Sequence, residues 1–315
     1  MKYHIAADIG GTQMRAASYH EQQEQPHKIR RVATRDSSGN ILDRLIELIA
    51  SVYPEDGDVE ALAVAAPGPL DPFQGVILEA PNIPEWVNMS LKEHLQRHFK
   101  IRVELGNDAN LAALGEWRFG AGRGHHHLIY LTVSTGIGGG VIVDDRLLLG
   151  VQGLAGELGH VTVIPDGPLC PCGQPGHLEA VASGTGIARW VQQELAKGAE
   201  SRLRDVPSPS SKQVAQAACE GDALAIQAFE RAGYYIGIAL ANYLHIFNPS
   251  IIIIGGGVSR SGSLLMDPIR RSLTEHAMIP HYLKELVLTV SALGDDAGLM
   301  GALALARSVT SSLDE

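Results

Sequence analysis

The chain has 315 residues, of which 45% are hydrophobic and 19% charged, so it is globular and long enough for two domains. Its formal net charge of −10 argues against broad binding to nucleic acids or anionic membranes, which favour a basic surface. It has three cysteines, no run of ~20 apolar residues, and a start that predicts a strand instead of a signal peptide. We therefore expect a cytoplasmic protein with neither a disulfide scaffold nor a membrane span.

The first part of the chain predicts an alternation of strands and helices. Strands are expected at 3–8, 14–19, 28–33, 59–65 and 101–105. Helices are expected from a cap at Ser38 or Asn40 to about Val52, from a cap at Ser90 to about Lys100, and from the sequence NDAN at 107–110 to just before Gly120.

After a glycine-rich joint at 120–124, the second part repeats the plan of the first. A strand at 127–133, a glycine turn at 134–140 and a strand at 141–144 match the strand, turn and strand at the amino end. Further strands are expected at 250–254 and 286–291, and helices from about Thr185 and at 222–245, 264–275 and 297–308. The sequence therefore predicts two α/β units of similar plan.

Three glycine clusters adjoin predicted strands, at 10–11, 136–140 and 255–257. The N–H groups of a glycine turn can surround a phosphate, and the nearby carboxylate of Asp8 can hold Mg²⁺ through water. Each of the first two turns can equally be a simple tight hairpin, since neither matches a known phosphate or dinucleotide motif. The third suits close approach to a flat ring such as adenine, or a plain strand-to-helix turn. Together they favour a phosphate held between two units.

The segment 156–179, GELGHVTVIPDGPLCPCGQPGHLE, contains a predicted metal site. His160, Cys170, Cys172 and His177 follow an H-x9-C-x-C-x4-H spacing. Zinc prefers four nitrogen or sulfur ligands in a tetrahedron, and a structural site is closed by protein ligands alone. The alternative is a polar loop with two free thiols.

Six segments, in this order, resemble the ROK family of sugar kinases and related repressors, and within it the bacterial ATP-dependent glucokinases: DIGGT, PNIPEW, NDAN, STGIGGG, GELGH and CPCGQPGHLE. The resemblance covers nearly the whole chain. It implies an α/β fold of the actin-like ATPase (ribonuclease H-like) type, with two domains around a central cleft in which ATP and sugar meet, and a homodimer. The smaller domain would comprise 1–119 and 297–315. The larger, 120–296, would carry the zinc loop and the dimerisation surface.

The resemblance also assigns roles by position. Asp108 would be the catalytic base. Sugar binding would fall to Gly68, Asn82, Asn107, Asp108, Glu157, His160 and Glu179, and ATP binding to Asp8, Gly10, Gly11, Thr12, Thr135, Gly136, Gly256 and Gly257. Taken alone, Asp108 also suits a helix cap, a position where aspartate is common.

One position departs from the family pattern, which usually has a third cysteine where this chain has His177. A set of two cysteines and two histidines still suits zinc, although its lower negative charge leaves the metal affinity open. His160 can serve twice, because one ring nitrogen can bind zinc while the other points at a sugar hydroxyl.

These observations predict ATP-dependent phosphorylation of glucose to glucose 6-phosphate. Fructose, mannose, N-acetylmannosamine and N-acetylglucosamine remain possible substrates, although Glu157 in GELGH favours an unmodified hexose. A sugar-responsive repressor of the family would carry a DNA-binding domain before DIGGT, for which the residues ahead of Asp8 leave no room. A non-catalytic sugar-binding protein predicts loss of Asp108 or of the phosphate loops, and both are present.

Overall fold

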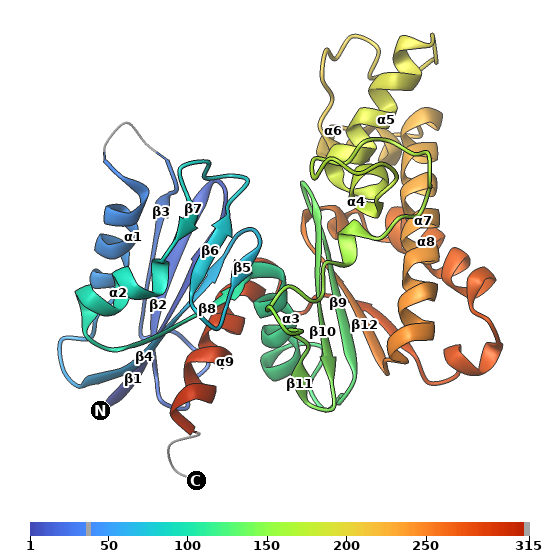
Figure 1. Cartoon of the computed structure of the whole chain (residues 1–315). Helices are drawn as coiled ribbons and strands as arrows, with labels where there is room; N and C mark the ends of the chain where they lie inside the picture. Colours follow the sequence, from blue (N-terminus) through green and yellow to red (C-terminus); the bar gives the residue numbers. More distant parts are fainter. Residues whose placement is uncertain (36–38, 312–315) are drawn as a thin grey trace.

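The computed structural model describes residues 1–35 and 39–311 of the chain. Two five-stranded sheets stand side by side, each with helices of its own, and two helices lie between them (Figure 1). Within the described residues, no helix is long and apolar enough to cross a membrane.

The first sheet has the strand order β3-β2-β1-β4-β8. Its strands are β1 (Lys2–Ile9), β2 (Gln13–His20), β3 (Lys28–Ala33), β4 (Asp58–Ala66) and β8 (Arg102–Asn107). Strands β1, β2 and β3 pair antiparallel, whereas β1, β4 and β8 run parallel. Helices α1 (Ile41–Ala50) and α2 (Leu91–Phe99) cover one face, and α9 (Ala297–Ser311) covers the other.

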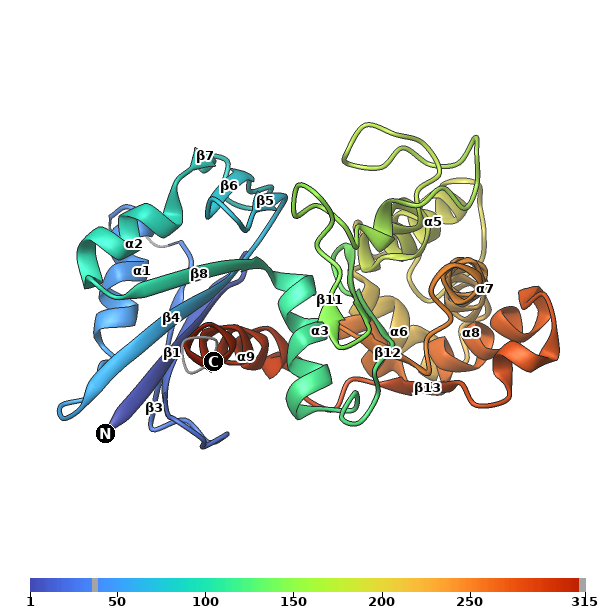
Figure 2. The ribbon, with the colours of Figure 1, turned by 60° about the horizontal axis from the view of Figure 1, so that its bottom comes forward.

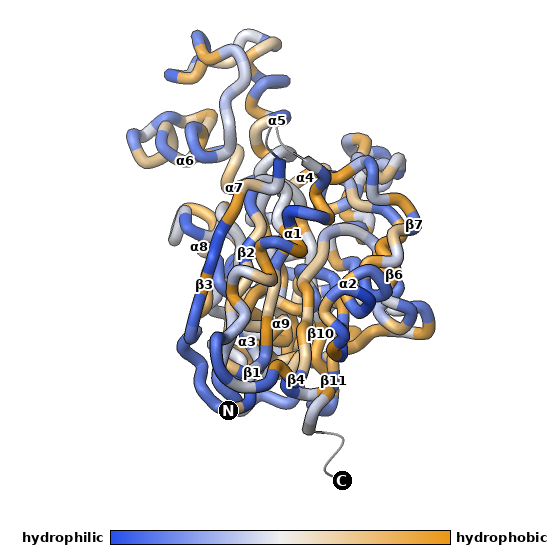
Figure 3. The backbone as a smooth tube through the Cα atoms, turned by 90° about the vertical axis from the view of Figure 1, so that its left-hand side faces the viewer, coloured by the Kyte–Doolittle hydropathy of each residue, from blue (hydrophilic) through white to orange (hydrophobic). Residues whose placement is uncertain are grey.

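Alternation along β1 explains why both faces are covered. Ile5, Ala7 and Ile9 pack into the core beneath α1 and α2, whereas Ala6 points to the opposite face and packs with α9. On that face β4 presents Ala61, Ala63 and Ala65, and such small side chains let α9 lie close to the sheet. The outer strand β3 and helix α2 are largely hydrophilic (Figure 3).

The second sheet repeats the topology of the first, with the order β11-β10-β9-β12-β13. Its strands are β9 (Leu128–Val133), β10 (Ile137–Val143), β11 (Arg146–Leu147), β12 (Ile251–Gly255) and β13 (Val287–Val290). Again the first three pair antiparallel and β9, β12 and β13 run parallel. The predicted repeat of plan is therefore confirmed, as is the α/β fold of the actin-like ATPase type.

Most predicted elements are present, and several were missed. The unpredicted elements are a small sheet of β5 (Leu70–Asp71), β6 (Val76–Glu79) and β7 (Val87–Met89), and the helices α4 (Leu178–Ala182) and α6 (Ser211–Cys219). The other helices on the second sheet are α5 (Gly184–Ala196), α7 (Ala223–Phe247) and α8 (Ser263–His276).

The structure tests two of the predicted helix caps. Asn40 caps α1, its side chain accepting a hydrogen bond from the N–H of Leu42, and the alternative cap Ser38 lies outside the described residues. Ser90 is the N-cap residue of α2, as predicted, although its side chain makes no capping hydrogen bond.

Helices α3 (Asp108–Phe119) and α9 pack against each other between the sheets (Figure 2). Helix α3 also lies directly on the bare backbone of β10. A Cβ atom on Gly138 would come 2.9 Å from that of Ala109, and one on Gly140 would come 2.6 Å from that of Ala113. Two glycines of the second cluster are therefore required for packing α3 onto the sheet.

Candidate active site

The predicted ligand-binding residues gather at the carboxyl ends of parallel strands. Asp8 is the last residue but one of β1, Asn107 ends β8, and Gly68 follows the end of β4 in the first sheet. In the second sheet, Thr135 follows β9, and Gly256 follows β12. This edge is where open α/β sheets bind their ligands.

The two glycine turns occupy equivalent places, each joining the first two strands of its sheet. In the turn after β1, the N–H of Gly10 donates to the carbonyl of Gln13 at 3.0 Å. In the turn after β9, the N–H of Ser134 donates to the carbonyl of Gly136 at 2.9 Å. Both are tight hairpins, as one alternative held, and their threonines, Thr12 and Thr135, are exposed.

Asn82 lies against the first of these turns. A Cβ atom on Gly11 would come 3.0 Å from the amide nitrogen of Asn82, so a larger residue at position 11 would displace that side chain. The third glycine cluster has a different environment. Gly256 has φ of +82°, and a Cβ there would collide with the carbonyl of Val133, whereas a Cβ on Gly257 would meet nothing within 4 Å. The backbone at Gly257 therefore faces open space.

Asp108 is the first residue of α3, and its neighbour Asn107 is the cap. The Asn107 side-chain oxygen accepts hydrogen bonds from the N–H groups of Ala109 (3.0 Å) and Asn110 (3.2 Å), and its Nδ2 donates to the Gly68 carbonyl (3.2 Å). Asp108 accepts one bond, from the N–H of Ala109 at 2.8 Å. Asn107 supplies the cap, and Asp108 beside it is exposed in the single chain.

The pKa of Asp108 is raised to about 7, first by the desolvating protein around it and further by the negative charges of Asp8 and Glu157. A carboxylate with a pKa near the working pH is well matched to accept a proton from an alcohol. Asp8 and Glu157, from distant parts of the chain, therefore both act electrostatically on Asp108.

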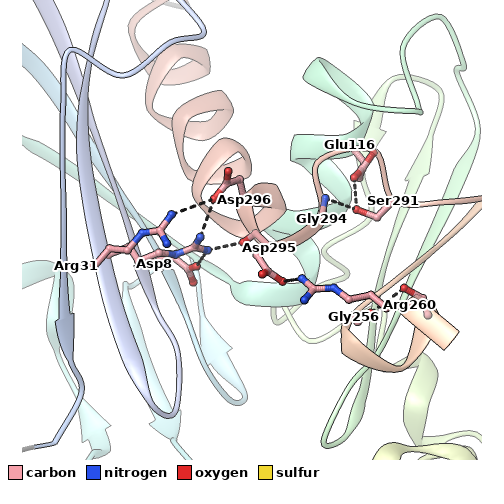
Figure 4. Close-up of polar contacts among 11 residues, drawn as sticks. Asp8, Arg31, Glu116, Gly256, Arg260, Ser291, Gly294, Asp295 and Asp296 are labelled. Carbon is pink, nitrogen blue, oxygen red and sulfur yellow. Dashed lines mark hydrogen bonds and ion pairs between the residues drawn. The ribbon is translucent and has the colours of Figure 1, made fainter. Parts of the chain in front are cut away.

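Asp8 forms an ion pair that was not predicted from the sequence. It pairs with the guanidinium of Arg15, which also donates to the Asp296 carboxylate at 2.8 Å and to the backbone carbonyl of Asp295 (Figure 4). Burial raises the pKa of Asp8, although Arg15 opposes the shift. In this conformation Arg15 binds one carboxylate oxygen of Asp8, and the role of Asp8 toward Mg²⁺ stays a prediction. The sequence feature that could have indicated this ion pair is Arg15, a single arginine inside the buried run of β2.

Of the three predicted sugar ligands from the segment 156–179, Glu179 contacts the second glycine turn, and His160 lies beside Glu157. His160 Nε2 lies 3.8 Å from a carboxylate oxygen of Glu157, whose pKa is raised mainly by burial. Glu179 accepts a hydrogen bond from the N–H of Ile137 at 2.9 Å, and a Cβ on Gly136 would collide with its carboxylate. Glu179 therefore joins the metal segment to the turn after β9.

The four predicted metal ligands converge, with one donor atom from each of His160, Cys170, Cys172 and His177 lying within 4.8 Å of all the others. The two Nδ1 atoms are 3.3 Å apart, Cys172 Sγ is 3.2 Å from His177 Nδ1, and Cys170 Sγ is 3.7 Å from His160 Nδ1. Bond lengths of about 2.0 Å to nitrogen and 2.3 Å to sulfur place tetrahedral ligands of zinc roughly 3.3–3.8 Å apart. The donor set therefore fits a tetrahedral zinc ion.

The chain resembles known proteins over its full length. The family model described as "ROK family" matches residues 4–309. A glucokinase from Thermotoga maritima is 38% identical, with 96% of each chain covered. The crystal structure of a ROK family glucokinase from Streptomyces griseus in complex with glucose and AMPPNP is 36% identical, with a TM-score of 0.82 over 97% of this chain and 99% of that one.

Regulators are similar as well. The structure of a ROK family transcriptional regulator, a homologue of the E. coli MLC protein, is 28% identical, with a TM-score of 0.87 over 98% of this chain and 78% of its own. From the match across residues 4–309 and the full-length identities, the chain belongs to the ROK family.

Proposed function

We propose that this protein is a glucokinase, which transfers the γ-phosphoryl group of ATP to the 6-hydroxyl of glucose. The observation that carries the proposal is Asp108, an accessible carboxylate at the carboxyl edge of the first sheet whose pKa is raised to about 7. The full-length similarity to proteins named glucokinase, one of them crystallised with glucose and AMPPNP, supports both substrates.

In the reaction, Asp108 accepts the proton of the sugar hydroxyl as its oxygen attacks the γ-phosphorus, and ADP leaves. Phosphoryl transfer depends mainly on positioning and charge stabilisation. The turns at Gly10–Gly11 and Thr135–Gly136 would hold phosphate oxygens, through donors other than the N–H of Gly10, which bonds the Gln13 carbonyl. The open backbone at Gly257 would lie against the adenosine. Mg²⁺ would be held by the phosphates of the nucleotide and, through water, by Asp8, and it would supply neutralisation of the phosphate charge.

Sugar recognition would rest on Glu157, His160 and Glu179, with Asn107, Asn82 and Gly68 on the side of the first sheet. Carboxylates discriminate well among hydroxyl patterns, because a buried acceptor that loses its partner is costly. We propose that zinc, held by His160, Cys170, Cys172 and His177, is structural. It would fix the His160 ring through Nδ1 and so aim Nε2 toward the sugar and Glu157.

Three further properties belong to the proposal. The chain would divide into domains 1–119 with 297–315, and 120–296, with α3 and α9 at their junction. All three cysteines are free, which suits a reducing cytoplasm. A homodimer would cover apolar side chains that the single chain exposes, such as Ile246 (70% exposed) and Met278 (66%), and light scattering would measure its mass.

The decisive experiment is ADP release from Mg-ATP with glucose, mannose, fructose, N-acetylmannosamine, N-acetylglucosamine or no sugar. Release with glucose that disappears in Asp108→Asn supports the proposal and its base together. Release with a different sugar keeps the mechanism and reassigns the specificity. The second candidate function is a sugar-responsive regulator, because the chain is also similar to a ROK family transcriptional regulator. The absence of ADP release from folded, zinc-loaded protein with every sugar would favour it.

A further inference from the structure

The chain passes from one sheet to the other twice, and one buried side chain binds both passages. The segment 120–127 leads from α3 to β9, and the segment 291–296 leads from β13 to α9. We call these the two crossover segments. Glu116, in the last part of α3, has 0% of its surface exposed and lies against both of them.

All the hydrogen bonds to the Glu116 carboxylate come from the crossover segments. From the first, the N–H of Ala121 donates at 2.8 Å. From the second, the donors are the hydroxyl of Ser291 (2.5 Å) and the N–H groups of Ala292 (3.3 Å) and Leu293 (2.8 Å). Four neutral donors thus satisfy a buried carboxylate, and each would be left without an acceptor if the carboxylate were removed.

The backbone of the first crossover is shaped around this residue. The N–H groups of Gly120 and Gly122 both donate to the Glu116 carbonyl, at 3.0 and 2.9 Å. A Cβ on Gly120 would collide with the Glu116 carboxylate, and one on Gly122 would come 2.9 Å from the Cα of Trp117. Neither glycine can be enlarged without displacing the crossover.

The second crossover continues directly into charged contacts on both sides of the molecule (Figure 4). Asp296 pairs with Arg15, the partner of Asp8 on the first sheet, while the Asp295 side chain pairs with Arg260. Arg260 follows the nucleotide-side glycine Gly256 by four residues. Exposed ion pairs such as Arg260–Asp295 contribute little energy by themselves, so the buried bonds to Glu116 are the firmer anchor of this segment.

We infer that Glu116 is a positioning residue for phosphoryl transfer: by joining the two crossovers it fixes how the sheet that carries Asp108 is placed relative to the sheet that carries Gly256 and Gly257. Asp108 and Glu116 stand on the same helix, eight residues and thus about 12 Å apart. A change in the angle between α3 and the crossover segments would therefore move Asp108 at the other end of α3. The inference rests on the proposed kinase activity for its catalytic readout.

The test is Glu116→Gln, with Glu104→Gln as the matched control. Glutamine keeps the size of the side chain but places an amide NH₂ where an oxygen now accepts N–H groups. Glu104 lies on β8 and pairs with Lys92 and Arg102, away from the crossovers. We expect kcat to fall 10- to 100-fold in Glu116→Gln, with KM for glucose and ATP changed less than threefold, and Glu104→Gln to stay within twofold of wild type.

Hydrogen exchange supplies a readout that a general loss of stability would not mimic. Exchange at the amides of Ala121, Ala292 and Leu293 should accelerate at least tenfold in Glu116→Gln, while amides in the centres of β4 and β12 keep their protection. Uniform acceleration, or an unchanged kcat, would overturn the inference.

Two outcomes would require a second variant or a readout other than activity. Should Glu116→Gln fail to fold, Ser291→Ala removes one of the four donors to Glu116, together with the acceptor of the Gly294 N–H. It must show the same pattern, with a two- to fivefold fall in kcat, or the inference is rejected. A wild-type chain inactive with every sugar would count against the proposed function instead. The exchange at Ala121, Ala292 and Leu293 would then still decide whether Glu116 holds the crossovers together.

Discussion

His160 faces two partners at once: its Nε2 lies 3.8 Å from the carboxylate of Glu157, while its Nδ1 lies 3.3 Å from the Nδ1 of His177 in the cluster of metal ligands. One ring thus connects the predicted zinc site with the predicted sugar site. Because the first contact depends on how the ring is held by the second, the metal should govern sugar binding without taking part in the chemistry.

Loss of zinc should therefore weaken glucose binding selectively. In Cys170→Ser we expect less than one zinc per chain by elemental analysis, a KM for glucose at least tenfold higher, and a KM for ATP within threefold of wild type. Cys170 has 2% of its surface exposed and lies inside the cluster, whereas Cys219 is exposed and outside it. Cys219→Ser is the matched control and should keep both metal and activity. Equal losses in the two variants would contradict a role for the metal.

His177→Cys should bind zinc more tightly than the natural chain. A third thiolate adds negative charge to the cluster, and His177 already lies 3.2 Å from Cys172 Sγ with 9% of its surface exposed. We expect zinc transfer to a competing chelator at pH 7 to require at least tenfold more chelator than in wild type. Transfer at the same or a lower chelator concentration would show that the imidazole is the better ligand here.

Activity should depend on the ionisation of Asp108. Its raised pKa means that the carboxylate is protonated at low pH and cannot accept the hydroxyl proton, so kcat/KM for glucose, which reports the sugar-free protein, should fall tenfold per pH unit below about pH 7 and level off above it. Initial rates at glucose concentrations well below KM from pH 5 to 9 would measure this. A flat profile down to pH 5 would mean that proton transfer to Asp108 does not limit the reaction, or that bound Mg-ATP lowers its pKa strongly.

The sequence predicted the parts of this molecule that local patterns determine. The places of Asp8 and Asn107 near strand ends follow from short buried runs that stop at or near polar residues. The convergence of the four predicted metal ligands follows from their spacing. Contacts across long separations left no such pattern. Glu116 binds residues about 175 positions away, and Arg15 binds Asp296, so neither role is visible in the residues beside them.

The glycine clusters show the same limit of sequence-based prediction, because their members look alike in sequence but have different surroundings in the structure. Gly140 touches α3, whereas Gly257 faces open space. Composition cannot separate a glycine needed for packing from one needed for a ligand. The distinction appears only once the helix and the sheet have been brought together.

That distinction can be measured with a pair of alanine substitutions. In Gly140→Ala the new methyl group would come 2.6 Å from the Cβ of Ala113, so α3 must shift, at a cost of about 1–3 kcal/mol for overpacking. We expect a lower Tm and, since α3 carries Asp108, a lower kcat. In Gly257→Ala the methyl group meets no protein atom within 4 Å, and Tm should be unchanged while KM for ATP rises. Thermal melts and ATP titrations on both variants distinguish a glycine needed for packing from one needed for nucleotide binding. An equal loss of Tm in the two variants would contradict the proposal that the backbone at Gly257 contacts the nucleotide.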